Sequence, residues 1–286
     1  MQKELHIGSP AIILFRFHRD FEVCHERIRL LRHLNPRLAI HAIYGGPKKN
    51  AGAARRLLGE SVESIWDYRD APERWKWLHP DLAIKEWYLR HGHRINFSRI
   101  FDHEWDLLCL ASMEDLYPRS MDASTLAFSG LELWTDIEGF WGWTSQPSCV
   151  PAVQRYMKHM KERYGMTRQK HASLGPAPSY PREFIERFAA EPHPRKIFDP
   201  IISEITLPGF AQALGFNFAD TRFHPGWSKI GPFLRARRVF NCEDISIQPK
   251  ILFKELQNQN GRRIFHPVKY HVPFLQIRRT IQELPG

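Results

Sequence analysis

Two adjacent acidic residues, Glu114 and Asp115, stand near the end of the stretch WDLLCLASMEDLYP (105–118). The stretch begins with an unbroken apolar run at 107–110, which is typical of a buried strand. In open α/β sheets the ligand lies just beyond the carboxyl ends of the strands, where acids can hold a metal ion or a ribose. A turn closed by Pro118 explains the same acids more simply. On this segment alone, the turn is slightly favoured.

Three other segments that predict strands also end in residues suited to a site. Arg16 lies at the end of the first segment (10–17), Tyr44 and Gly45 near the end of the second (38–46), and Asp67 near the end of the third (62–68). Because the carboxyl ends of parallel strands share one edge of a sheet, we expect these residues to border a common site. Tandem carboxylates on a strand point to opposite faces, so we expect only Asp115 of the acid pair to reach a metal ion directly.

The order of the predicted elements indicates how the site is built. The first half alternates the strand 10–17, a helix from Asp20 to before Pro36, strands 38–46 and 62–68, a helix from Pro80, and the strand 105–115. This order predicts an α/β fold with a mostly parallel central sheet flanked by helices. The second half has an aromatic segment (131–146), a helix from Pro151 to Gly165, a loop (166–181), a helix 202–216 that Pro208 splits, a helix 248–256 and a strand 262–270.

Composition bounds the class of protein. The chain has 286 residues, 43% of them hydrophobic, and a formal net charge of +10, which favours an anionic partner such as nucleotide phosphates, nucleic acid or an anionic membrane surface. The basic residues are scattered, so we expect no nucleic-acid arm. Four cysteines without CxxC spacing indicate free thiols in a reducing compartment. The sequence shows no signal-peptide pattern, so we expect a cytoplasmic protein and leave open peripheral attachment to the inner face of the membrane.

Several common catalytic motifs are missing. The string HRD (18–20) lacks the other kinase motifs, and the sequence contains no GxGxxG after a strand, no P-loop and no GxSxG. The remaining signal is the set of polar residues at strand ends.

This set resembles the GT-A fold of nucleotide-sugar glycosyltransferases. The later segments GFWGWTSQ (139–146), ISEITLP (202–208) and GRRIFHPVKY (261–270) are similar to the sugar pocket, the general-base segment and the C-terminal strand of that family. The resemblance implies that Glu204 is the general base, that Trp141 and Trp143 wall the sugar pocket, and that His266 and Lys269 contact the metal or the diphosphate. It also implies one domain, with a nucleotide-binding half (10–118), a sugar and acceptor half (119–270) and a tail (271–286).

The acid motif departs from the family pattern, since MED stands where DxD is expected. The resemblance therefore leaves two ways to neutralise the diphosphate. One is a divalent cation, Mn²⁺ or Mg²⁺, held by Asp115 and His266, with Glu114 also in the donor site. The other is metal-independent and uses Lys269 with Arg262 or Arg263. The tandem acids at 243 and 244 are a rival to Glu204, either as the base or as a helix cap.

The resemblance implies an inverting transfer of sugar from a nucleotide-diphosphate donor, with UDP favoured, to a hydroxyl on a glycan or lipid-linked acceptor. Nucleic acid is not an expected partner on this interpretation. Two alternatives stay open: a non-catalytic, basic nucleic-acid-binding α/β module, and a degenerate transferase that binds a sugar nucleotide without turnover.

Overall fold

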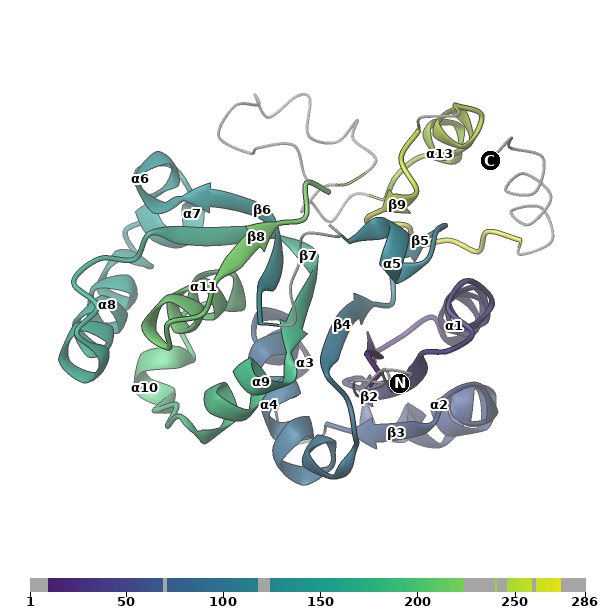
Figure 1. The fold of residues 1–286 in the computed structure, drawn as a ribbon, viewed down its shortest axis with the longest axis horizontal. Coiled ribbons are helices and arrows are strands. Elements are labelled where there is room, and N and C mark those ends of the chain that lie inside the picture. Colours follow the sequence, from purple (N-terminus) through teal and green to yellow (C-terminus); the bar gives the residue numbers. More distant parts are fainter. Residues whose placement is uncertain are drawn as a thin grey trace, which may run out of the picture.

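The computed structural model describes residues 10–68, 71–117, 124–223, 240, 246–258 and 261–273. A seven-stranded sheet in the order β3-β2-β1-β4-β7-β6-β8 forms the centre of the molecule, and β5 pairs with β9 in a separate two-stranded sheet (Figure 1). The strands are β1 (Ile12–Phe17), β2 (Ala39–Tyr44), β3 (Ser64–Asp67), β4 (Arg99–Glu104), β5 (Leu108–Cys109), β6 (Leu126–Leu133), β7 (His171–Pro181), β8 (Phe218–Asp220) and β9 (Ile264–Phe265).

The central sheet is mixed. Its first four neighbours, β3, β2, β1 and β4, are parallel, whereas β7 runs antiparallel to both β4 and β6. The predicted α/β fold with a mostly parallel sheet flanked by helices is confirmed. The helices are α1 (Phe21–Leu34), α2 (Ala51–Leu58), α3 (Glu73–Leu78), α4 (Pro80–Arg90), α5 (Met113–Leu116), α6 (Trp134–Ile137), α7 (Gly142–Ser145), α8 (Val150–Tyr164), α9 (Arg182–Ala190), α10 (Arg195–Phe198), α11 (Ser203–Ala213) and α13 (Pro249–Leu256).

Helices cover both faces of the sheet, and the alternation of side chains along β1 shows how. Ile12 and Leu14 pack in a core that includes residues of α4, α8, α9 and α11. Ile13 and Phe15 point to the opposite face, toward residues of α1 and α2. Arg16 lies two residues after Leu14, so its side chain points to the same face of the sheet, which α4 and α11 cover. None of the described helices is long and apolar enough to cross a bilayer.

The prediction of a core strand at 105–115 is wrong. The inner strand of this region is β4, which ends just before residue 105. The sequence of β4, RIFDHE, has few apolar residues, but its acids are paired within the fold and it is therefore stable inside the sheet. The apolar run that suggested a strand forms only the short β5. The chain then turns into α5, where the Ser112 hydroxyl accepts a hydrogen bond from the Asp115 amide at 3.1 Å. Glu114 and Asp115 therefore occupy the first turn of a helix.

Two other local expectations are also wrong. The segment predicted as a loop contains β7, an inner strand, although Pro176 and Pro178 cannot donate to a ladder. Its pairing with β6 is irregular between Ala127 and Ser129, and this irregularity accommodates the prolines. Pro208 does not split its helix either, since α11 runs through it without a break. Asp20 does occupy the N-cap position of α1, although its side chain makes no capping hydrogen bond there.

Candidate active site

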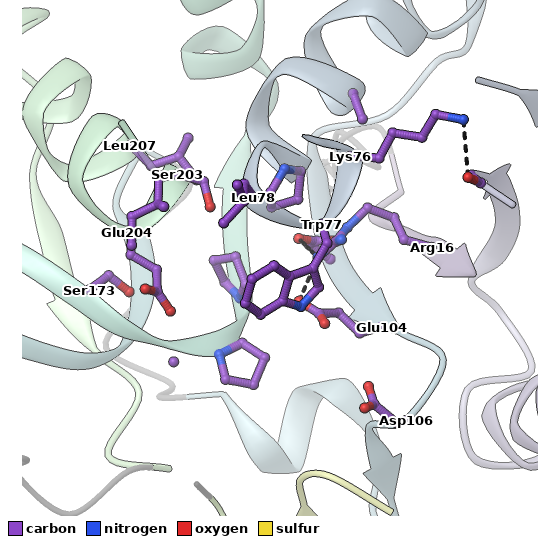
Figure 2. Close-up of a pocket in the computed structure, with 18 of the residues that line it drawn as sticks. Arg16, Lys76, Trp77, Leu78, Glu104, Asp106, Ser173, Ser203, Glu204 and Leu207 are labelled. Atoms are coloured by element: carbon purple, nitrogen blue, oxygen red, sulfur yellow. Dashed lines mark hydrogen bonds and ion pairs between the residues drawn. The ribbon is translucent and has the colours of Figure 1, made fainter. Parts of the chain in front are cut away.

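A cavity of about 1040 Å³ opens beyond the carboxyl ends of β1, β2 and β4 (Figure 2). Arg16 of β1, Gly45 just after β2, and Glu104 at the end of β4 line one side of it. Glu204, in the first turn of α11, lines the cavity from another part of the fold. This is the place where open α/β sheets bind ligands, so the cavity is the candidate active site.

Glu104, Asp106 and His266 form a cluster within this cavity. One ligand atom from each residue lies within 4.8 Å of the other two. The antiparallel pairing of β5 with β9 builds the cluster, because Asp106 precedes β5 by two residues and His266 directly follows β9. The Nε2 atom of His266 lies 3.6 Å from Oδ1 of Asp106.

The donor set of this cluster fits a divalent cation. Two carboxylates and one imidazole are ligands that Mn²⁺ and similar ions accept. The Oδ1 atom of Asp106 is buried and has no hydrogen-bond partner among the described residues, as expected for an atom that ligates an ion. Burial raises the pKa of Asp106, but His266 and Lys269 outweigh it and hold that pKa below its usual value. Asp106 is therefore ionised at neutral pH.

Arg16 ties this cluster to the sheet. Its Nε donates to Oδ1 of Asp102 at 2.6 Å, and its Nη2 donates to Oδ2 of Asp102 at 3.0 Å and to Oε1 of Glu104 at 2.8 Å. The parallel register of β1 and β4 places Arg16 opposite Glu104 and Leu14 opposite Asp102, so all three charged side chains lie on one face. Burial alone would lower the pKa of Arg16, but the two carboxylates raise it. Arg16 is thus a fixed cation beside the acids.

This buried pairing leads to a prediction about stability. We expect Arg16→Met to lower the free energy of unfolding by about 3–5 kcal/mol, because it leaves the buried Asp102 carboxylate without its cation. The double variant Arg16→Met/Asp102→Asn should recover most of that loss, since no uncompensated charge remains at Asp102. Urea unfolding of the wild type, the single variant and the double variant measures both values. A double variant no more stable than Arg16→Met would contradict the pairing argument.

Glu204 lies in a setting suited to proton transfer. The side chain is half-buried in the cavity wall. Burial raises the pKa of Glu204 to about 8, and the negative charge of Glu104 adds to the increase. A carboxylate with a pKa near neutrality can take a proton from a hydroxyl group as that group reacts.

The cavity gathers some of the residues that the sequence indicated and not others. Those that line it are Arg16, Gly45, Trp141, Trp143, Glu204 and His266; those outside the lining are Tyr44, Asp67, Glu114, Asp115, Arg262, Arg263 and Lys269. Tyr44 donates to the carbonyl oxygen of Pro47, and Asp67 accepts from Arg55. The acids at 243 and 244 lie outside the described residues.

Three acids of the cavity were not predicted from the sequence: Asp102, Glu104 and Asp106. The sequence did contain a pattern that could have indicated them. Acids recur at every second position, and in extended backbone this spacing points their side chains to the same face. Glu104-Trp105-Asp106 also has the acid-x-acid spacing of the DxD motif, which the resemblance placed at 113–115.

Comparison with known proteins gave structural matches alone, since neither a family model nor a curated protein matches the sequence. The chain is similar to the WbbM bifunctional glycosyltransferase (TM-score 0.44, 10% identity), covering 98% of this chain but 51% of that one, so it spans about half the length of that protein. It is also similar to the galactosyltransferase LgtC in complex with donor and acceptor sugar analogues (TM-score 0.42, 12% identity, 96% of each chain). A cytidylyltransferase from Leptospira borgpetersenii matches at TM-score 0.42 and 9% identity, over 96% of this chain and 95% of that one. Over nearly its whole length, the chain thus has structural matches among GT-A glycosyltransferases, at low sequence identity.

Proposed function

We propose that this protein is a glycosyltransferase that moves a sugar from a nucleotide-diphosphate donor to a hydroxyl acceptor, with inversion. One observation carries the proposal: Glu104, Asp106 and His266 share with Glu204 a single cavity at the carboxyl ends of parallel strands. The cluster suits a leaving diphosphate, and Glu204 suits the attacking hydroxyl.

The donor's diphosphate belongs at the cluster end of the cavity. A divalent cation held by Glu104, Asp106 and His266 would neutralise the charge that develops on the leaving group. The nucleoside would extend toward Gly45, where the Nζ of Lys76 donates to the Gly45 carbonyl oxygen at 3.0 Å and keeps that loop in place. Lys269 stays a candidate for direct neutralisation, because its charge acts on Asp106 although it lies outside the cavity lining.

The acceptor hydroxyl belongs at Glu204. The oxygen of the acceptor hydroxyl attacks the anomeric carbon of the donor sugar, and the hydroxyl proton passes to the Glu204 carboxylate. The bond from the anomeric carbon to the diphosphate oxygen breaks at the same time. Attack opposite the leaving group inverts the anomeric centre. Trp141 and Trp143 offer an aromatic wall for the apolar face of a sugar. A glycan or lipid-linked acceptor is part of the proposal.

Calorimetric titration of UDP, then GDP and CDP, with Mn²⁺ and again with EDTA tests the proposal. We expect micromolar binding of one nucleotide that requires Mn²⁺. Binding that survives EDTA would support the donor site while assigning the diphosphate contact to basic side chains. If no nucleotide bound under either condition, the transferase proposal would fail, and oligonucleotide binding would be measured next.

A further inference from the structure

Trp77 is an exposed tryptophan at the edge of the candidate active site. It lies on α3 and lines the cavity, yet 61% of its surface is exposed. Its neighbours Trp75 and Leu78 pack against the hydrophobic core, so α3 is anchored without it. Among the described residues, no aromatic ring or cation stacks on the Trp77 indole. The described part of the chain thus leaves this large indole uncovered at the edge of the cavity.

The position of α3 relates Trp77 to the proposed base. Directly after α3, the Nε2 atom of His79 lies 3.0 Å from the carbonyl oxygen of Asp199, shortly before α11 begins. The Thr206 hydroxyl of α11 donates to Asp81 at 2.6 Å. The junction between α3 and α4 is thus held near the start of α11, the helix that carries Glu204.

Figure 2 is consistent with this placement. In that view, Leu78 is drawn near Ser203 and Leu207 of α11, and the Trp77 indole is seen between Glu204 and Glu104. Lys76 extends the other way, toward the Gly45 carbonyl oxygen that we assign to the nucleoside side. Adjacent residues of α3 therefore face different parts of the cavity: Lys76 faces Gly45, whereas the Trp77 indole lies, in that view, between Glu204 and Glu104.

We propose that Trp77 binds a pyranose ring of the acceptor, by stacking its indole on the ring's apolar C–H face. This inference rests on the proposed transferase function and extends it from a hydroxyl acceptor to a glycoside. Stacking covers the exposed indole and leaves the ring's hydroxyls free at the edges, where one can reach Glu204. Trp77 is then a residue that selects and orients the acceptor and takes no part in proton transfer.

Two sources present the same ring: a free glycoside and a lipid-linked glycan. Saturation-transfer NMR with methyl β-D-glucopyranoside, methyl β-D-galactopyranoside and octyl β-D-glucopyranoside, in the presence of UDP and Mn²⁺, measures binding without turnover. Stronger saturation of the octyl glycoside than of its methyl counterpart supports stacking with a lipid-linked acceptor. Equal saturation supports stacking with a free glycoside.

The comparison uses Trp77→Ala, Trp77→Phe and the control Leu133→Ala, which removes another large side chain, 50% exposed and outside the cavity lining. We expect the apparent affinity for at least one glycoside to fall roughly tenfold or more in Trp77→Ala, to recover partly in Trp77→Phe and to stay unchanged in Leu133→Ala. UDP affinity should be the same in all four proteins.

Three outcomes would overturn the inference and leave the proposed function standing. Equal saturation in the wild type and Trp77→Ala, or no saturation of any probe in the wild type, would remove Trp77 from the acceptor site. A loss of UDP affinity in Trp77→Ala with glycoside binding intact would assign the indole to the nucleoside. Absence of binding of UDP, GDP and CDP in the wild type is a separate result, which overturns the proposed function and this inference with it.

Discussion

Replacing Glu204 by Gln should reduce the rate of sugar transfer by about 10²–10⁴-fold, the usual contribution of a general base. The amide keeps the size of the side chain but cannot accept the acceptor's proton. Affinity for UDP should stay within a few-fold of the wild type, because we assign the diphosphate to the cluster of Glu104, Asp106 and His266. Initial rates with a UDP-sugar and calorimetric titration of UDP measure the two quantities. Transfer at the wild-type rate would refute the assignment of Glu204 as base.

The pH dependence gives an independent check on the same residue. In the proposed mechanism the ionised form of Glu204 is the active one, so the wild-type kcat/KM should rise with pH through the pKa of about 8. A cation bound beside Glu104 would lower that pKa and move the rise to lower pH. The residual activity of Glu204→Gln should not show this rise.

The stability of the metal-free protein should fall as pH rises through the range in which the activity increases. A carboxyl whose pKa is raised in the folded protein holds its proton more tightly there than in the unfolded chain, so its contribution to stability is lost as pH rises from about 4.5 to 8. Metal-free Glu204→Gln should therefore melt at a higher temperature than the wild type at pH 8.5 and at a similar temperature near pH 4.5. A Tm difference that does not depend on pH would show that the pKa of Glu204 is not raised in the folded protein.

The sequence predicted the architecture better than the site, and β4 shows why. Order of elements and apolar runs are local signals, and they sufficed for β1, β2 and β3 and for the helices α1, α4, α8 and α13, but not for α2 and α9. The inner strand β4 has no such run, because its acids are compensated by Arg16, a residue 86 positions away from Asp102. A pairing of that kind cannot be read from a local pattern, so the strand and its acids were placed about ten residues too late.

The second half of the chain also contains features that depend on pairing between distant segments and so could not be predicted from local patterns. Proline content indicated a loop where β7 lies, since the irregular pairing that tolerates the prolines depends on β6. His266 was identified through a family resemblance, but its partner Asp106 follows only from the pairing of β5 with β9, two segments far apart in the chain. Trp77 carried no motif at all. Its exposure at the cavity is a property of the folded protein.

Asp106→Asn tests the assignment of the cation site and should have the largest effect on donor binding. We expect it to lower the Mn²⁺-dependent affinity for UDP by about 100-fold or more, because loss of a direct ligand should cost at least as much as loss of an outer-shell partner. Asp115→Asn should leave that affinity unchanged. Asp115 is exposed on α5, where it accepts a hydrogen bond from the Ser112 hydroxyl at 2.5 Å, and it lies outside the cavity lining.

The pair of variants separates the two possible acid motifs, because both substitutions remove one charge and keep the side-chain size. Titration of Mn²⁺ by electron paramagnetic resonance, with and without UDP, measures the cation directly and does not depend on turnover. The reverse result, with Mn²⁺ binding lost in Asp115→Asn and retained in Asp106→Asn, would assign the cation to the MED motif. Loss in neither variant would favour the metal-independent arrangement, in which basic side chains neutralise the diphosphate. Loss in Asp106→Asn alone would make Glu104-Trp105-Asp106 the working acid motif, since it is the acid pair that shares the cavity with Glu204.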